Sequence, residues 1–115
     1  MEDTVFHKII RGEISADRVH EDDVCIVIRD IVPKAPVHLL VIPKRYVEHL
    51  GVSKVDDEAL LGHLLFTAGE VARKLNMGNA FKVVINNGSG SGQIVPYLHV
   101  HVLGGWKNKP QGAAV

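Results

Sequence analysis

Two histidines, His99 and His101, lie one residue apart in an otherwise apolar stretch, residues 97–105. Side chains of a β-strand alternate between its two faces, so His99, His101 and Tyr97 should share one face. The residues between them should face an apolar core: Leu98, Val100 and Val102. An imidazole has a pKa of about 6.5 and can serve near neutrality as nucleophile, base or acid. The spacing predicts a reaction centre; the alternative is a solvated face that carries two histidines.

A glycine-rich segment, residues 86–92, comes just before this stretch. It lacks the Gly-Lys-Ser/Thr ending that holds triphosphate and metal, so it is not a P-loop. Residues 86–105 contain no lysine or arginine. An anionic ligand would therefore depend on imidazole and on neutral donors, namely backbone N–H groups of the loop and the side-chain amides of Asn86 and Gln93.

Length, charge and cysteine content exclude several classes of protein. A chain of 115 residues with 46% hydrophobic residues is expected to form one domain, residues 1–115. Thirteen basic residues balance thirteen acidic ones, which gives no field that favours nucleic acid or a membrane surface. The single cysteine, Cys25, excludes an internal disulfide and favours a reducing compartment; we expect it to fill core space. The acidic opening and the short apolar runs predict a cytoplasmic protein without a leader or a membrane span.

Apolar patterning predicts two helices. Asp3 or Thr4 caps a short helix that Gly12 ends. Asp56 or Asp57 begins a long helix that Gly78 ends. Both helices have an apolar face at helical spacing: Val5, Phe6, Ile9 and Ile10 in the first, and Leu60, Leu61, Leu64, Leu65, Ala68, Val71, Ala72 and Leu75 in the second.

β-Branched and apolar runs predict five strands, at residues 18–20, 24–28, 38–42, 81–85 and 97–103. Short connections between these segments favour an α+β fold: an antiparallel five-stranded sheet with the long helix on one face and a short N-terminal helix.

Taken in order, these segments resemble a known family. Gly92-Gln93 followed by His99-Val100-His101-Val102-Leu103-Gly104-Gly105 resembles the histidine-triad (HIT) motif of the Hint branch of nucleotide-binding hydrolases. Residues 3–14, 21–23, 29–31, 33–38, 41–44 and 85–88 are similar to the family in order and spacing. The chain departs from its pattern at three positions. Tyr97 stands where the first triad histidine is expected, Ile94 stands where a phosphate-contacting serine is common, and Pro96 is unusual in its place.

The resemblance implies hydrolysis of a nucleoside monophosphate joined to an amine or related leaving group, through a nucleotidyl-histidine intermediate. His99 matches the nucleophile, which needs one nitrogen free and the other N–H held by a backbone carbonyl. A carbonyl is present whatever the side chain, so Tyr97 need not destroy nucleophilicity. His101 matches the donor to a phosphoryl oxygen or to the leaving group, and His38 supports the triad from an adjacent strand.

The resemblance also implies a purine nucleotide site and a homodimer. Asp30 matches the acceptor of the ribose hydroxyls, although an aspartate just before Pro33 is also typical of a turn. Apolar walls bind a purine with modest selectivity, and the same side chains would also suit a core: Phe6, Ile9, Ile28 and Ile31. No cofactor is implied. The long helix and an edge strand would form the dimer interface, and its many apolar residues support this loosely.

Other functions remain open. A nucleotide-binding protein without turnover would explain Tyr97 and Ile94. The pair His99 and His101 could chelate zinc, although no third ligand is evident. Hydrolysis of dinucleoside polyphosphates, as in the Fhit branch, is a further alternative. The remaining histidines lie in polar or helical contexts and are expected to be solvated: His7, His20, His49 and His63.

Overall fold

The computed structural model describes residues 3–108 and 110; the first two residues of the acidic opening and residues 109 and 111–115 lie outside the described part. Its elements in chain order are α1 (Val5–Ile10), β1 (Arg18–Glu21), β2 (Cys25–Arg29), β3 (Val37–Pro43), α2 (Glu58–Lys74), β4 (Phe81–Val84) and β5 (Val100–Gly104). The strands form one sheet in the order β1-β2-β3-β5-β4, with every neighbouring pair antiparallel. The α+β prediction is confirmed.

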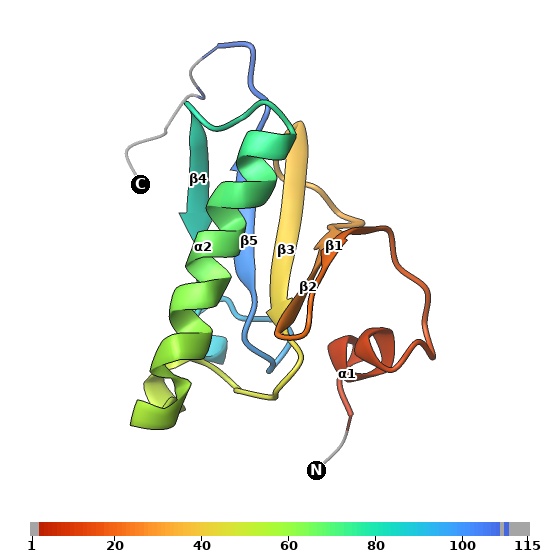
Figure 1. Ribbon diagram of the computed structural model, residues 1–115, viewed down its shortest axis with the longest axis vertical. Coiled ribbons are helices and arrows are strands. Elements are labelled where there is room, and N and C mark those ends of the chain that lie inside the picture. Colours follow the sequence, from red (N-terminus) through yellow and green to blue (C-terminus); the bar gives the residue numbers. More distant parts are fainter. Residues whose placement is uncertain (1–2, 109, 111–115) are drawn as a thin grey trace.

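Helix α2 lies across one face of the sheet (Figure 1). The period-2 alternation of β2 and β3 divides their side chains between two cores. Val27, Leu39 and Val41 pack under α2, whereas Ile28 and Leu40 pack on the opposite face with α1. Burying one such side chain fully contributes about 1.5–3 kcal/mol. The sheet therefore holds a helix on each face, and the α1 face carries the histidines of interest.

Helix α1 begins with a capping box at Thr4, so Thr4 and not Asp3 is the cap. The Thr4 hydroxyl accepts from the His7 backbone N–H at 3.3 Å, and His7 Nδ1 accepts from the Thr4 N–H at 3.0 Å. Phe6 and Ile9 are buried against the sheet. Gly12, with φ of 79°, follows the helix end as predicted.

Helix α2 ends earlier than predicted. A 3₁₀ turn, Val55–Asp57, precedes Glu58, and the helix stops at Lys74 instead of reaching Gly78. Asn76 takes the left-handed conformation, with φ of 61°. The Asn76 N–H donates to Arg73 O at 3.0 Å and the Met77 N–H to Ala72 O at 2.7 Å, which is the Schellman pattern. Asparagine thus fills the place that the prediction gave to glycine.

Strand β5 begins at Val100, three residues later than predicted. Residues 97–99 lie outside the strand and bond elsewhere: the Tyr97 N–H donates to Val95 O at 2.8 Å and the Leu98 N–H to Val47 O at 2.7 Å. The predicted alternation persists. Leu98 and Val100 belong to the core under α2, and Tyr97 belongs to the core on the other face.

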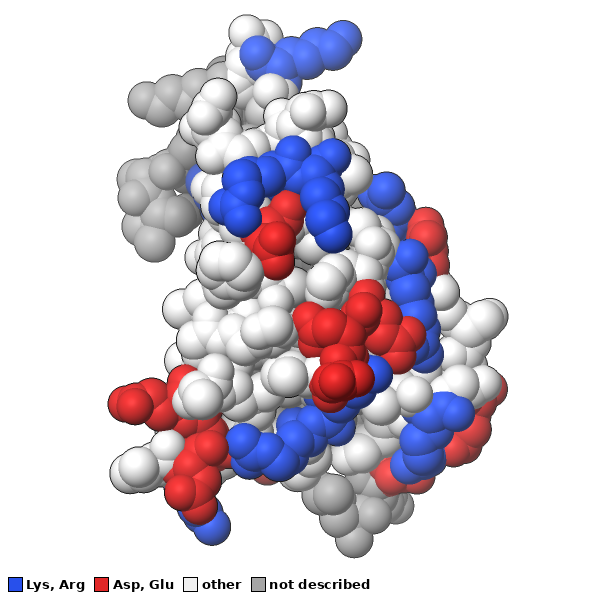
Figure 2. Space-filling view, in the orientation of Figure 1, with Lys and Arg blue, Asp and Glu red and all other residues white. Residues whose placement is uncertain are grey.

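Charged side chains are interleaved on the face drawn in Figure 2, where basic and acidic groups alternate in small patches. This matches the equal numbers of basic and acidic residues. Among the described residues, no helix has the length and apolarity needed to cross a membrane.

Candidate active site

A cavity of about 960 Å³ opens on the α1 face of the sheet. Ligand sites commonly measure about 300–1,000 Å³. Segments that are distant in the sequence contribute to its wall: α1, the end of β2, β3, β5 and the loop after β4. Nine of the ten residues predicted for the site line it: Phe6, Ile9, Ile28, Asp30, Ile31, His38, Asn86, His99 and His101.

His99 lies one residue before β5 and is 7% exposed. Its Nδ1 is 2.7 Å from the Tyr97 carbonyl oxygen. A carbonyl only accepts, so Nδ1 carries the proton and Nε2 keeps its lone pair. Burial lowers the pKa of His99, despite the opposing effect of the Tyr97 carbonyl and of Asp30, so the ring is neutral. This is the state that a nucleophile needs.

His38 and His101 form a chain of hydrogen bonds that fixes both tautomers. The Lys34 backbone N–H donates to His38 Nδ1 at 3.0 Å, so the proton of His38 is on Nε2. That N–H donates to His101 Nδ1 at 2.9 Å, which places the proton of His101 on its own Nε2. Within the described residues, this buried N–H of His101 has no hydrogen-bond partner. It is a free donor beside the cavity.

Burial and two neighbouring imidazoles set the charge of His101. Burial, followed by the proximity of His99 and His38, lowers the pKa of His101 to about 4. Burial also lowers the pKa of His38. All three imidazoles are therefore neutral at pH 7. We call His38, His99 and His101 the cavity histidines.

Asp30 holds its position through the turn that follows β2. Its Oδ1 accepts from the Val32 N–H at 2.9 Å, and its Oδ2 lies 3.4 Å from His38 Nε2. The side chain is 20% exposed and lines the cavity. Asp30 can therefore stabilise the turn and face a ligand at the same time.

Tyr97 contributes its backbone carbonyl to the site and its side chain to the core. The ring is fully buried and its hydroxyl donates to Pro43 O at 2.6 Å. Burial raises the pKa of Tyr97 to about 12. The ring packs edge-on against Phe6, His7 and Tyr46, away from the cavity wall.

Gln93 is the predicted site residue that the structure does not bring to the cavity. Its Oε1 accepts from the Gly88 N–H at 2.6 Å, and its Nε2 donates to Glu48 O at 2.9 Å and to Val95 O at 3.0 Å. Because both ends of the amide are engaged in the fold, the expectation that this amide faces a phosphate is wrong here. Gln93 instead fixes the shape of the glycine-rich loop. Its neighbour Ile94 is 92% exposed and lines the cavity.

Lys34 lines the cavity and was not predicted, because it is distant in the sequence from residues 86–105. Its backbone N–H orients His38, and the two-proline loop between β2 and β3 carries it to the site. A cation four residues before His38, in a loop leading into that strand, was the available signal. Arg29 also reaches the wall, where it pairs with Asp17 at 3.2 Å.

Asp30, His38 and His101 could hold a metal ion, because their ligand atoms lie within 4.8 Å of one another. The structure thus supplies the third ligand that the sequence did not show, although His99 is not in this group. The donor set, two imidazoles and a carboxylate, suits zinc.

The prediction that the other histidines are solvated holds only in part, because all four are partly exposed and each also makes a contact within the fold. His7 closes the α1 capping box and has a buried Nε2. His20 and His63 each lie 2.8 Å from Asp22 Oδ2, one from β1 and the other from α2. His49 accepts from the Gly51 N–H in a short 3₁₀ turn.

Comparison with known proteins places this geometry in a family. The HIT domain matches residues 11–108. A HIT-like protein of the cyanobacterium Synechocystis sp. is 54% identical over 104 residues, which cover 90% of this chain and 91% of that protein. A HIT-like protein of Synechococcus elongatus is 50% identical over the same shares of the two chains.

Solved structures agree in fold. A HIT family hydrolase from Legionella pneumophila superposes with a TM-score of 0.89 at 38% identity, covering 93% of this chain and 96% of that one. A HIT family hydrolase from Clostridium thermocellum gives a TM-score of 0.89 at 35% identity, covering 96% and 97%.

Proposed function

This chain belongs to the HIT domain family, and we propose that it is a nucleotide-binding hydrolase of the Hint-like branch. The proposed substrate is a purine nucleoside monophosphate joined to an amine or a related leaving group. The proposed reaction passes through a nucleotidyl-histidine at His99. Hydrolases of the same family share the fold at 38% and 35% identity, which supports hydrolysis in general.

The observation that carries the proposal is the tautomer of His99. The Tyr97 carbonyl holds the Nδ1 proton, so the lone pair of Nε2 is free on a ring that lines the cavity. A neutral imidazole with one nitrogen anchored is an activated nucleophile that needs no proton removed before it attacks.

His101 serves best as a hydrogen-bond donor to the phosphoryl group. Because burial and the neighbouring imidazoles lower the pKa of His101 to about 4, its ring is neutral at pH 7. A charged general acid is therefore scarce, whereas the neutral Nε2–H is always present. Charge builds up on the phosphoryl oxygens in the transition state, and a fixed donor there stabilises it. The bond from His38 holds that donor in place.

The chemical steps balance with water as the only co-reactant. Nε2 of His99 forms a bond to phosphorus while the bond from phosphorus to the amine breaks, and the amine leaves with a proton from solvent. Water then attacks phosphorus, the bond from phosphorus to Nε2 breaks, and the water proton returns to solvent. The products are the nucleoside monophosphate and the free amine.

The cavity supports a nucleotide as the ligand. Phe6, Ile9 and Ile28 offer apolar walls for a base, and Asp30 offers a carboxylate for ribose hydroxyls. Lys34 adds a positive charge to the wall that also carries His38 and His101, which favours an anionic ligand. We propose that base selectivity is modest, because apolar area does not distinguish base edges. We propose no required cofactor and an intracellular location.

A homodimer completes the proposal. Leu65 and Phe66 on α2 are 53% and 60% exposed, and Val83 on the edge strand β4 is 39% exposed. Apolar area of this kind is typical of an interface. Sedimentation equilibrium at micromolar concentration tests it; a monomer only would refute the dimer and leave the proposed chemistry standing.

The activity is tested by incubating the full chain with adenosine 5′-phosphoramidate and measuring the release of adenosine monophosphate. We expect turnover that the product inhibits competitively. Binding of adenosine monophosphate without turnover would support the alternative of a nucleotide-binding protein, for which the exposed Ile94 on the cavity wall is the favouring observation.

A further inference from the structure

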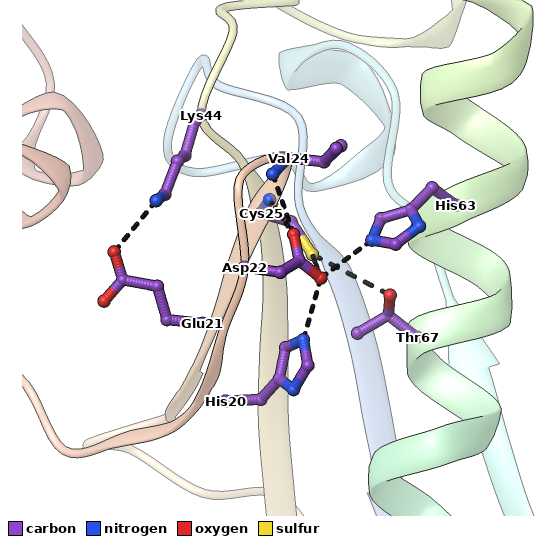
Figure 3. Close-up of polar contacts among 8 residues, drawn as sticks. All are labelled: His20, Glu21, Asp22, Val24, Cys25, Lys44, His63 and Thr67. Atoms are coloured by element: carbon purple, nitrogen blue, oxygen red, sulfur yellow. Dashed lines mark hydrogen bonds and ion pairs between the residues drawn. The ribbon is translucent and has the colours of Figure 1, made fainter.

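A second group of histidines lies on the α2 side of the sheet, at the turn between β1 and β2 (Figure 3). His20 from β1, Asp22 and Cys25 from the turn and the start of β2, and His63 from α2 direct their polar atoms toward one another. We call these four residues the Asp22 cluster. None of them lines the cavity of the proposed active site.

From this geometry we propose that the Asp22 cluster is a binding site for a divalent transition metal, with Zn²⁺ the fitting ion. The ligands are the Nε2 atoms of His20 and His63, Oδ2 of Asp22 and Sγ of Cys25. Two imidazoles, a carboxylate and a thiolate form a donor set that zinc accepts in four-coordinate sites. The proposal does not depend on the reaction proposed above.

The carboxylate of Asp22 is already oriented for this role. Its Oδ1 accepts from the backbone N–H groups of Val24 and Cys25, at 2.8 and 2.9 Å. Oδ2 therefore faces both imidazoles, with each Nε2 at 2.8 Å.

The distances of three of the four ligands fit a tetrahedral ion after small shifts. Ligand atoms of His20, Asp22 and Cys25 lie within 4.8 Å of one another. Bond lengths of about 2.3 Å to sulfur and about 2.0 Å to oxygen place those two atoms about 3.5 Å apart in a tetrahedron. Cys25 Sγ and Asp22 Oδ2 are 3.8 Å apart. By the same geometry the His20 nitrogen needs to move about 0.5 Å from Oδ2. His63, which is 2.8 Å from Oδ2 but outside the group of three, needs a larger movement to close the fourth side from α2.

The surroundings allow an ion to reach the site. Side chains of His20, Asp22 and His63 are 17%, 29% and 35% exposed. His63 also lines a hollow of about 490 Å³ together with Asp23 and Asp56. Cys25 is fully buried, and metal binding would displace its thiol proton to solvent. The protons that His20 and His63 direct from Nε2 to Asp22 would move to Nδ1, which frees the Nε2 lone pairs for the ion.

The experiment uses the full chain, freed of metal by a chelator and then titrated with Co²⁺ and Zn²⁺. We expect one Co²⁺ per chain with a thiolate-to-metal charge-transfer band, which Zn²⁺ displaces. Cys25→Ser should lose the band. His63→Ala, on the partly exposed helix surface, should weaken Zn²⁺ binding by about tenfold or more while circular dichroism reports an intact fold.

The matched control is His101→Ala, which disrupts the other metal-compatible group and should retain the wild-type band. Two results would overturn the proposal. One is the absence of any thiolate band in the folded wild type, which would make the Asp22 cluster a hydrogen-bonded brace between α2 and the β1–β2 turn. The other is binding that His101→Ala abolishes and His63→Ala preserves, which would assign the metal to the cavity.

Discussion

The two histidine groups of this molecule lie on opposite faces of one sheet and differ in what holds each imidazole. The hydrogen bonds of the cavity histidines are to neutral groups: His99 to a backbone carbonyl, and His38 to a backbone N–H and to His101. The carboxylate of Asp30 is farther from His38 Nε2, at 3.4 Å. In the Asp22 cluster, two imidazoles share one carboxylate oxygen. Neutral partners fix a tautomer and leave reactive nitrogens free, whereas a shared anion gathers nitrogens around one point. The partner therefore determines which chemistry the same side chain offers.

We expect the largest effect when the nucleophile is removed from the cavity histidines. His99→Ala should lower turnover of adenosine phosphoramidate by more than about a thousandfold, because no covalent intermediate can form. Affinity for adenosine monophosphate should stay within about tenfold, because the apolar wall is intact. Steady-state kinetics and equilibrium dialysis measure the two quantities; retention of most activity would make the nucleophile assignment wrong.

Removing the hydrogen bond behind His101 should have a smaller effect. In His38→Ala the Nδ1 of His101 loses its donor, and the ring is free to adopt the other tautomer. We expect kcat to fall by about a hundredfold with little change in KM. Conservative His38→Gln, which retains an N–H donor, should recover part of the loss. Equal losses in both variants would show that the bond is not what positions His101.

The positions that depart from the family pattern test whether side chain or backbone governs the nucleophile. Ile94→Ser should raise kcat/KM about tenfold or more, because a hydrogen bond to a charged phosphate contributes about 1–3 kcal/mol. Tyr97→His should matter less to chemistry, since the carbonyl that holds His99 is backbone. A large gain from Tyr97→His and none from Ile94→Ser would contradict the backbone argument.

The cavity histidines and the Asp22 cluster should also differ in how they change the free energy of unfolding with pH. Burial lowers the pKa of each cavity histidine below the ordinary 6.5, so the unfolded chain binds more protons as pH falls from 6.5 toward 4. Their stabilising contribution is full above pH 6.5 and is lost on acidification, by up to about 1.4 kcal/mol per pH unit for one proton. The pKa of Asp22 is lowered from 3.8, so its contribution is lost only below that pH.

Urea denaturation across this range measures the effect. His101→Gln should flatten the loss of unfolding free energy between pH 6.5 and pH 4, and Asp22→Asn should leave the slope in that window in place. A slope that is unchanged in His101→Gln would show that this imidazole is not held neutral by the fold.

Local patterns were enough to predict the fold. Apolar spacing located every strand and both helices to within a few residues, because each strand has a buried face and α2 has one apolar side. The errors lie at the ends. The stop of α2 at Lys74 depends on Asn76 in a left-handed conformation, and the late start of β5 depends on Leu98 bonding to Val47. Neither the end of α2 nor the start of β5 follows from the spacing of apolar residues.

The site residues that could be predicted are those whose side chains suit few roles other than chemistry or binding. His99, His101 and Asp30 line the cavity as expected. Gln93 was misplaced because an amide that could donate to a phosphate also satisfies backbone groups, and only the fold decides between them. Lys34 and the Asp22 cluster were missed because contacts between distant segments bring their members together, as between His63 of α2 and Asp22 of the β1–β2 turn.

The central claim is that Nε2 of His99 forms a bond to phosphorus. Its most direct test is rapid acid or base quenching of the protein during turnover of adenosine phosphoramidate, followed by mass spectrometry of the peptides. We expect an adenylyl group on the peptide that carries His99, absent in His99→Ala and accumulating if the hydrolytic step is slowed. An adduct on His101 or His38, or turnover without any adduct in quenched samples under both conditions, would contradict it.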